Sequence, residues 1–264
     1  ARGFLKPAMG RSNLLVETGC LVEKIEFEGT RATGIRFVQN GETRLARCRG
    51  EVILSAGAIG SVQLLLLSGI GPAAQLAEHG IATVLEKPGV GENLQDHLQL
   101  RLIHKVTGVT TLNESYKSLF NRALMGIDYA LRRRGPLTMA PSQLGAFTRS
   151  DPHQERANIQ FHVQPLSLDK FGDPLHDFAA FTTSVANLRP TSRGHVRLRS
   201  TGPADKPMIQ PNYLSTPEDR QVAADSLRLT RRIAAQPALA KYKPREVKPG
   251  VQFQRDAEPA RLAG

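Results

Sequence analysis

The sequence predicts an α+β fold, and three observations support this class. Residues 14–48 alternate apolar and polar side chains between turn signals, which is typical of a β-meander with one face on a core. Residues 51–71 have the pattern of a short apolar strand, a glycine-rich turn and a helix. Beyond Gly135, strand-like runs separated by Pro, Gly, Asn and Asp predict an antiparallel sheet. We therefore expect the remnant of an α/β domain, with the meander, packed on a second domain in which helices flank that sheet.

The meander is defined by the parity of its apolar residues. Leu21, Ile25 and Phe27 share one parity, and Asn40-Gly41 is a strong hairpin signal further along. Val22 has the opposite parity to this core set. We therefore expect the main chain of Val22, and not its side chain, to contact a ligand at this edge.

Residues 51–71 form the stretch around which the chain is organised. Residues 51–55 show no polar alternation after Val52, which predicts a strand buried on both faces. The small residues of 56–60 suit a sharp turn, and a short buried helix is expected from about Ser61 to Leu67. The N–H groups at such a helix start suit a ligand with phosphate or carbonyl oxygens.

The remaining elements follow from the same signals. A short helix is expected at 72–79, a long amphipathic helix within 113–134 with its apolar positions from Leu119 to Leu131, and a third helix from the start signal at 215–218 to Pro237. The strands expected to form one antiparallel sheet are 158–166, 177–185, 195–199 and 207–214. The predicted domains are 1–100 and 101–240, followed by a polar, loose tail at 241–264.

Composition narrows the classes of function. Of 264 residues, 40% are hydrophobic, which is enough for a core, and no apolar run approaches the length of a membrane span. The net charge of +11 is compatible with nucleic acid, but Arg132, Arg133 and Arg134 suit the last turn of a helix, where cations complement its dipole. The other basic residues are scattered, so no nucleic-acid partner is expected. Two cysteines without metal-type spacing and no signal segment at the start predict a cytoplasmic location.

Three motifs carry a resemblance to a known family. They are NLLVETGCLV at 13–22, GAIGSVQLLLLSGIG at 57–71 and GVGENLQDH at 89–97. Their residues, order and spacing resemble the glucose–methanol–choline (GMC) flavoprotein oxidoreductases, and the resemblance extends from the start of the chain to about Asp256.

The resemblance implies FAD as the cofactor and an alcohol as the substrate. In that family a hydride passes from the alcohol carbon to the flavin N5 while a histidine takes the hydroxyl proton. The first domain would then be part of an FAD-binding domain, and the antiparallel sheet would be the floor of the substrate cavity. His162 and Gln164 are the cavity candidates, with a hydrogen-bonded core histidine as the alternative for His162. The positions expected at the cofactor are Val22, Ser55, Ala56, Gly57, Asn93, Asp96 and His97, the last in a structural role.

No catalytic residue is assigned. The family's glycine-rich dinucleotide motif has no counterpart here, because the G-x-G-x-x-A match at 69–74 follows a helix and not a strand. None of the seven histidines fits the family's C-terminal catalytic motif. We therefore interpret the chain as a central portion of a choline-dehydrogenase-like alcohol dehydrogenase, and expect it alone to be inactive and not to retain FAD.

Several alternatives stay open. A non-catalytic small-molecule-binding or scaffold module derived from this family is the alternative function. Asp173, His176 and Asp177 have metal-compatible side chains but no second ligand pair, so no metal is expected. A choline cage needs aromatic residues, and the chain has no Trp, so another primary alcohol is as consistent. Homo-oligomerisation is not decided by the sequence.

Overall fold

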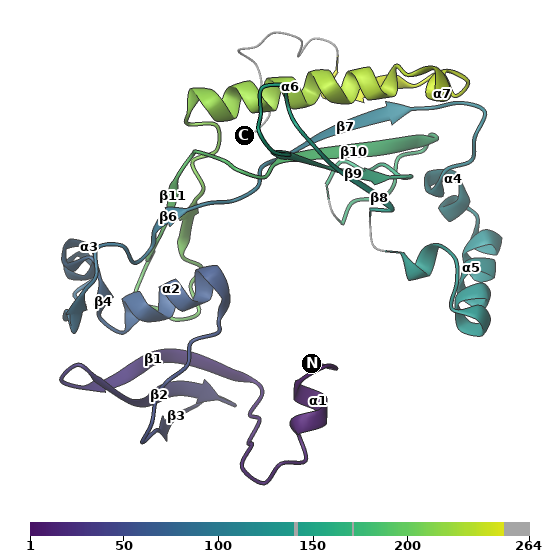
Figure 1. Cartoon of the computed structure of the whole chain (residues 1–264). Coiled ribbons are helices and arrows are strands. Elements are labelled where there is room, and N and C mark those ends of the chain that lie inside the picture. Colours follow the sequence, from purple (N-terminus) through teal and green to yellow (C-terminus); the bar gives the residue numbers. More distant parts are fainter. Residues whose placement is uncertain (140–141, 171, 251–264) are drawn as a thin grey trace. The chain divides into compact units, whose positions relative to one another are not determined.

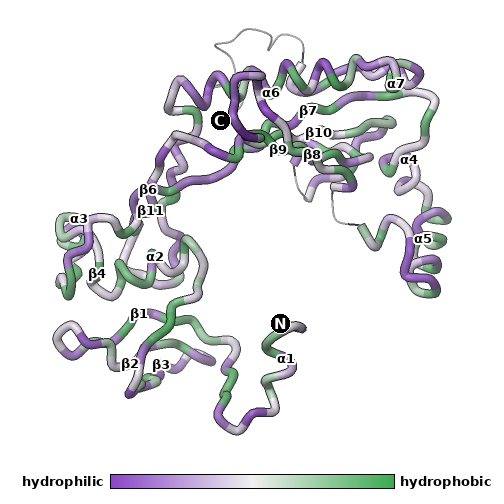
Figure 2. The backbone as a smooth tube through the Cα atoms, viewed as in Figure 1, coloured by the Kyte–Doolittle hydropathy of each residue, from purple (hydrophilic) through white to green (hydrophobic). Residues whose placement is uncertain are grey.

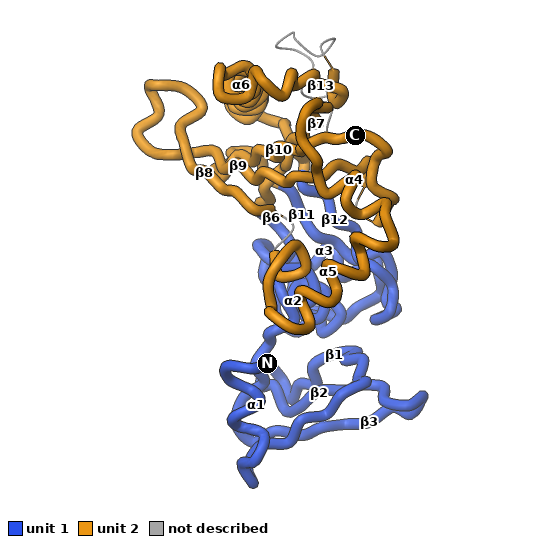
Figure 3. Tube along the Cα trace, turned by 90° about the vertical axis from the view of Figure 1, so that its right-hand side faces the viewer, with its two compact units in different colours: residues 1–94, 194–211 blue, residues 95–193, 212–264 orange. Residues whose placement is uncertain are grey.

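The computed structural model describes residues 1–139, 142–170 and 172–250 (Figure 1). It divides into two compact units, which Figure 3 colours separately. Unit 1 comprises Ala1–Leu94 and Gly194–Pro211, and unit 2 comprises Gln95–Arg193 and Asn212–Gly264. Helices and mainly antiparallel sheets occur together, so the α+β class is confirmed. None of the helices among the described residues is both long and apolar enough to cross a membrane.

Unit 1 begins with a short helix and the expected meander. After α1 (Leu5–Ala8), strands β1 (Cys20–Glu28), β2 (Arg31–Gln39) and β3 (Glu42–Arg47) pair antiparallel in that order. Gln39 lies opposite Glu42, and the two residues between them, Asn40 and Gly41, have φ of 54° and 82°. Two positive φ angles define the type I′ turn whose twist suits a two-residue hairpin. The hairpin prediction is confirmed.

A β-bulge at Glu23 changes the parity of β1. Val22 lies opposite Phe37, but Lys24 lies opposite Arg36, so one residue of β1 is left without a partner. Val22 therefore shares the face of Ile25, which is buried, while the Leu21 side chain is 42% exposed. The predicted parity of Leu21 and Val22 is wrong, because a bulge reverses the alternation and leaves no clear signal in the sequence.

Residues 51–55 do not form the predicted buried strand. No described residue pairs with them in a sheet, and the side chain of Ile53 is 76% exposed. An apolar run becomes a strand only where a neighbouring strand can accept its hydrogen bonds. Helix α2 (Gly57–Leu67) starts about four residues earlier than predicted, with Gly57 at φ 81°. It ends before Gly69, where a Cβ atom would lie 2.4 Å from the carbonyl oxygen of Ala82.

The rest of unit 1 packs around α2. Strand β4 (Ile70–Gly71) pairs parallel with β5 (Leu85–Glu86), and α3 (Ala73–Glu78) lies between them in sequence. Leu66, Leu76 and Leu198 form the buried cluster of this unit. A three-stranded antiparallel sheet combines β6 (Glu92–Leu94), β11 (Gly194–Arg197) and β12 (Met208–Gln210). The prediction that the last two strands belong to the sheet of 158–185 is therefore wrong.

Unit 2 is built on a five-stranded antiparallel sheet. Its order is β13 (Arg245–Lys248), β7 (Gln99–Lys105), β10 (Ala180–Asn187), β9 (Ile159–Gln164) and β8 (Leu144–Thr148). Helix α6 (Pro217–Ala234) covers one face, and Figure 2 shows apolar and polar residues alternating along it. The buried cluster between helix and sheet comprises Leu100, Leu102, Ile159, Phe161, Val185, Leu214, Val222, Ala223 and Leu227.

Three strands of this sheet were not predicted. Strands β7 and β8 lie in segments to which no strand was assigned, and β13 lies in the tail predicted to be loose. The part of that tail from 251 to 264 is outside the described residues. Helix α6 is confirmed: the Thr216 side chain accepts a hydrogen bond from the Asp219 N–H, and Pro217 is its first residue. The short helix α7 (Pro237–Ala240) follows it.

The long helix predicted within 113–134 is confirmed as α5 (Leu119–Arg132), and a short helix that was not predicted precedes it. Helix α4 (Leu112–Lys117) ends at Ser118, whose side chain caps α5. The chain then continues through Gly135 into the 3-10 turn η1 (Pro136–Thr138). The apolar face of α5 is exposed, with Leu119 and Leu131 at 76% and 79%. The periodicity therefore predicted α5 and its end, but not α4 or the exposure of the apolar face of α5.

Candidate functional site

The second face of the unit 2 sheet, away from α6, carries polar side chains. On β9, Ile159 and Phe161 belong to the cluster under α6, so the alternating residues His162 and Gln164 face the other way. His162 lies opposite Ser184 of β10, and Gln164 lies opposite Thr182. The two cavity candidates therefore share one face with hydroxyl-bearing neighbours.

Gln164 has an unused hydrogen-bonding atom on this face. Its side chain is 5% exposed, and its Nε2 donates to Ser142 Oγ at 3.3 Å. Its Oε1 is buried and has no hydrogen-bond partner among the described residues. A buried acceptor left without a partner is unfavourable by about 1–3 kcal/mol. The side chain of Gln164 therefore has an acceptor to offer, which a ligand hydroxyl could reach only after the amide turns toward the polar face.

Arg101 belongs to the same polar face but was not among the site residues predicted from the sequence. It lies opposite Ser184, which is itself opposite His162, so the three residues form a row across β7, β10 and β9. Its Nη1 donates to the Asp169 carbonyl oxygen at 3.4 Å. Burial lowers the pKa of Arg101, and the charge of Asp169 counteracts this in part. The alternation of Gln99, Arg101 and apolar residues along β7 was the available sequence signal.

Asp96 and His97 lie near the start of unit 2, and both are exposed. The hydroxyl of Tyr213 donates to Asp96 Oδ2, and burial together with this hydrogen bond raises the pKa of Tyr213 to about 12. His97 Nε2 lies 3.2 Å from the Leu188 carbonyl oxygen. His97 also lines a cavity of about 470 Å³ whose other lining residues are Gln95, Leu188, Arg189, Pro190, Thr191 and Arg193. The two arginines make this cavity suitable for an anionic group.

The remaining cofactor candidates belong to unit 1. Ser55, Ala56 and Gly57 are exposed at the start of α2, whose N-cap residue Ala56 makes no side-chain hydrogen bond. The N–H groups of this turn are therefore available to carbonyl or phosphate oxygens. Val22 is half-buried on β1, and Asn93 is exposed on β6 with φ 63°. Strand β1 packs against α2, where the Ile25 N–H donates to Ser68 Oγ at 2.8 Å.

His176 takes part in a local hydrogen-bond network. Its Nδ1 lies 3.0 Å from Ser167 Oγ, and its Nε2 lies 3.3 Å from Asp169 Oδ2. This order of serine, histidine and aspartate matches a hydrolytic triad in residue types. Ser167 is completely buried, however, and its main chain is bonded by Asn113, so a substrate cannot reach the hydroxyl. The network therefore connects α4 to the segment before β10 and has a structural role.

Comparison with known proteins identifies the family. The family model described as "GMC oxidoreductase" matches in two parts, an N-terminal part at 1–99 and a C-terminal part at 190–262. The chain belongs to the GMC oxidoreductase family. The two matches include both the glycine-rich turn before α2 and the segment that contains α6.

Relatives of this GMC oxidoreductase chain are similar over nearly its whole length. Human mitochondrial choline dehydrogenase is 42% identical over 98% of the chain and 43% of its own length. The alcohol dehydrogenase [acceptor] of Pseudomonas putida is 39% identical over 98% of the chain and 47% of its own length. The crystal structure of pyridoxine 4-oxidase from Mesorbium loti matches with a TM-score of 0.80 and 26% identity, over 98% of the chain and 46% of that protein. The chain thus spans less than half the length of each of these three proteins.

Proposed function

We propose that this chain contributes to an FAD-dependent oxidoreductase that acts on the CH–OH group of an alcohol, similar to a choline dehydrogenase. The observation that carries the proposal is the identity of 42% and 39% to relatives named choline dehydrogenase and alcohol dehydrogenase. FAD, when bound, would accept a hydride from the alcohol carbon at its N5 atom. By itself the chain is inactive in this proposal and does not retain FAD through purification.

The residues present fit a dinucleotide in two respects. A Cβ atom at Gly57 would meet nothing within 4 Å, so a ligand can approach the main chain at the start of α2. In unit 2, the cavity beside His97 has Arg189 and Arg193 in its wall, and guanidinium groups bind phosphate well. The further cofactor contacts that we propose are Val22, Ser55, Ala56 and Asn93 in unit 1 and Asp96 in unit 2.

The alcohol is proposed to lie on the polar face of the unit 2 sheet. The Gln164 amide would turn toward this face and accept the hydrogen bond of the alcohol hydroxyl at Oε1, because this atom has no partner among the described residues. His162 lies two residues before Gln164 on the same face of β9, and its imidazole would orient the alcohol hydroxyl. Arg101 would act through position and charge rather than by proton transfer, because a guanidinium does not release its proton near neutral pH.

The cofactor part of the proposal is tested by adding FAD to the purified full chain and following its fluorescence anisotropy. In Ala56→Glu a carboxylate stands at the start of α2, where it favours the helix but repels phosphate. The matched control is Ala77→Glu, at an exposed alanine of α3 in the same unit. Ala56→Glu should weaken FAD binding at least about tenfold and the control should not, because repulsion between close charges reaches this size. Equal binding by both variants would contradict the assignment of the α2 turn.

The proposed inactivity of the isolated chain needs a separate assay. The full chain is supplied with FAD, an artificial electron acceptor, and choline or a primary aliphatic alcohol. No turnover above the rate of added FAD alone is expected, because none of the seven histidines matches the family's catalytic motif. Robust turnover would refute the inactivity, and His162 would then be the first histidine to replace.

A further inference from the structure

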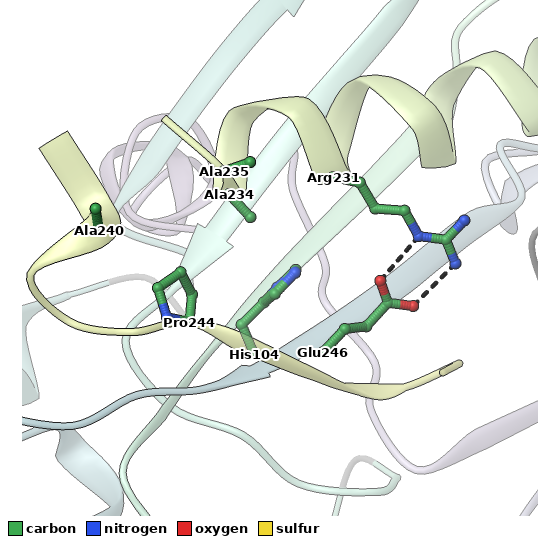
Figure 4. Close-up of a pocket in the computed structure, with 7 residues that line it drawn as sticks. All are labelled: His104, Arg231, Ala234, Ala235, Ala240, Pro244 and Glu246. Carbon is green, nitrogen blue, oxygen red and sulfur yellow. Dashed lines mark hydrogen bonds and ion pairs between the residues drawn. The ribbon is translucent and has the colours of Figure 1, made fainter. Parts of the chain in front are cut away.

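A second cavity lies on the opposite side of the unit 2 sheet from His162 and Gln164. Figure 4 shows it between β7, α6, α7 and the segment leading into β13. Its volume is about 370 Å³, which falls within the range of small-molecule sites. The residues that line it are His104, Arg231, Ala234, Ala235, Ala240, Pro244 and Glu246. The cavity is therefore separate from the proposed cofactor and alcohol sites.

His104 lines this cavity, and one of its ring nitrogens has no hydrogen-bond partner among the described residues. The residue is 3% exposed, and its ring stacks on Phe181 with centroids 5.0 Å apart and an interplanar angle of 14°. Its Nδ1 is buried and has no hydrogen-bond partner among the described residues. Stacking fixes the plane of the ring, and the close-up shows its nitrogen-bearing edge directed between Arg231 and the alanines (Figure 4). Buried polar atoms are nearly always paired, so an atom of this kind indicates a missing partner.

The charged residues of the cavity neutralise each other. Arg231 donates from Nε and Nη2 to the two carboxylate oxygens of Glu246, at 2.8 and 2.9 Å. The Gly250 N–H also donates to Glu246 Oε1, at 3.2 Å. A charged ligand would have to break this pair to find a counter-ion. The other walls are alanine and proline side chains, which offer only apolar contact.

We propose that this cavity binds a small neutral molecule that has an apolar body and one hydroxyl group, with the hydroxyl bonded to the imidazole of His104. A molecule with several hydroxyl groups would place most of them against Ala234, Ala235 and Pro244, without partners. A purely apolar molecule would leave the imidazole nitrogen unsatisfied. One hydroxyl can hydrogen-bond to the imidazole in either neutral tautomer, because a hydroxyl can both donate and accept.

The ionisation of His104 agrees with a neutral ligand. Burial lowers the pKa of His104; the charge of Glu246 raises it and that of Arg231 lowers it, and the net shift is downward. The ring is therefore neutral near physiological pH and adds no charge to the cavity.

The test follows the imidazole signals of the full chain by NMR, with isotope label in histidine only. The seven histidines give seven ring signals, and His104→Phe assigns one of them. The probes are benzyl alcohol, benzoate and benzylammonium, which share a ring and differ in charge. Benzyl alcohol should shift the His104 signal along a saturating curve, and both charged probes should bind at least about tenfold more weakly, because each would lack a counter-ion. The His162 signal reports independently on the polar face of the sheet.

Two variants locate the site. Ala235→Leu and Ala240→Leu each place a larger side chain in the cavity from an exposed position, so the fold should tolerate them. Either should abolish the His104 response to benzyl alcohol, whereas the matched control Ala77→Leu, on an exposed face of α3, should not. The proposal is overturned if the His104 signal does not saturate with benzyl alcohol, if a charged probe binds equally well, or if both cavity variants respond like the original chain.

Discussion

Asp219 connects the start of α6 to the loop that follows β10, and its removal gives a sharp test of the unit 2 packing. Its side chain is 3% exposed. Oδ1 accepts the Thr191 N–H at 2.9 Å and Asn187 Nδ2 at 3.1 Å, and Oδ2 accepts the Ser192 N–H at 2.9 Å. In Asp219→Ala, the main-chain N–H groups of Thr191 and Ser192 lose the buried carboxylate that accepts their hydrogen bonds. At about 1–3 kcal/mol each, the free energy of unfolding should fall by about 2–6 kcal/mol.

The same bonds predict how this stabilisation depends on pH. Burial alone would raise the pKa of Asp219, but the hydrogen bonds of Ser192 and Thr191 lower it by more, so the net shift is downward. A carboxylate with a lowered pKa in the folded state stabilises the fold above its unfolded pKa of about 3.9, and this contribution is lost as the pH falls below that value. The original chain and Asp219→Ala should therefore become similar in stability in acid.

Urea denaturation followed by circular dichroism measures both effects, near neutral pH and in acid. The matched control is Glu218→Ala, the exposed acidic neighbour in the same helical turn. The control removes only a favourable charge near the helix start, which contributes about 0.3–1 kcal/mol. A loss for Asp219→Ala no larger than that of the control would refute the reasoning.

Three further predictions concern other parts of the chain. Leu102→Ala, at a fully buried position, should lower the free energy of unfolding by about 2–5 kcal/mol. Leu124→Ala, on the exposed face of α5, should change it by less than about 0.5 kcal/mol, and equal losses in thermal unfolding would contradict the core assignment. Ser68→Ala removes the acceptor of the Ile25 N–H, so amide exchange at Ile25 should speed up, and unchanged exchange would show that this bond does not connect β1 to α2. Because burial lowers the pKa of His104 in the folded state, the original chain should lose stability as the pH falls below about 6.5, and His104→Phe should lose less. Parallel curves of unfolding free energy against pH would refute this last point.

Features that depend on neighbouring residues could be predicted. The Asn40-Gly41 turn needs only two residues that tolerate positive φ, and the start of α6 needs only Thr216 and Pro217 in sequence. Side chains alternate between the two faces of a strand, so the sequence alone placed His162 and Gln164 on the same face. In each case the physical cause lies within a few residues of its effect.

Features that depend on distant partners could not be predicted. Residues 51–55 have the composition of a buried strand, yet they have no sheet partner among the described residues, and Ile53 is exposed. Strand β13 looked like part of a polar tail, but β7 accepts it as an edge strand. The row of Arg101, Ser184 and His162 exists only because three strands pair in one register.

The sequence alone determined the class of fold, the family resemblance and the turns and helix starts, because these depend on side-chain types and on local backbone preferences. The tertiary structure decided which strands pair, where the bulge at Glu23 reverses the alternation, and which buried atoms have no partner within the described part of the chain. Gln164 and His104 became candidate ligand contacts only when packing had left Oε1 of the first and Nδ1 of the second buried without a partner among the described residues. That removal depends on chain segments far apart in sequence, so no local pattern can reveal it.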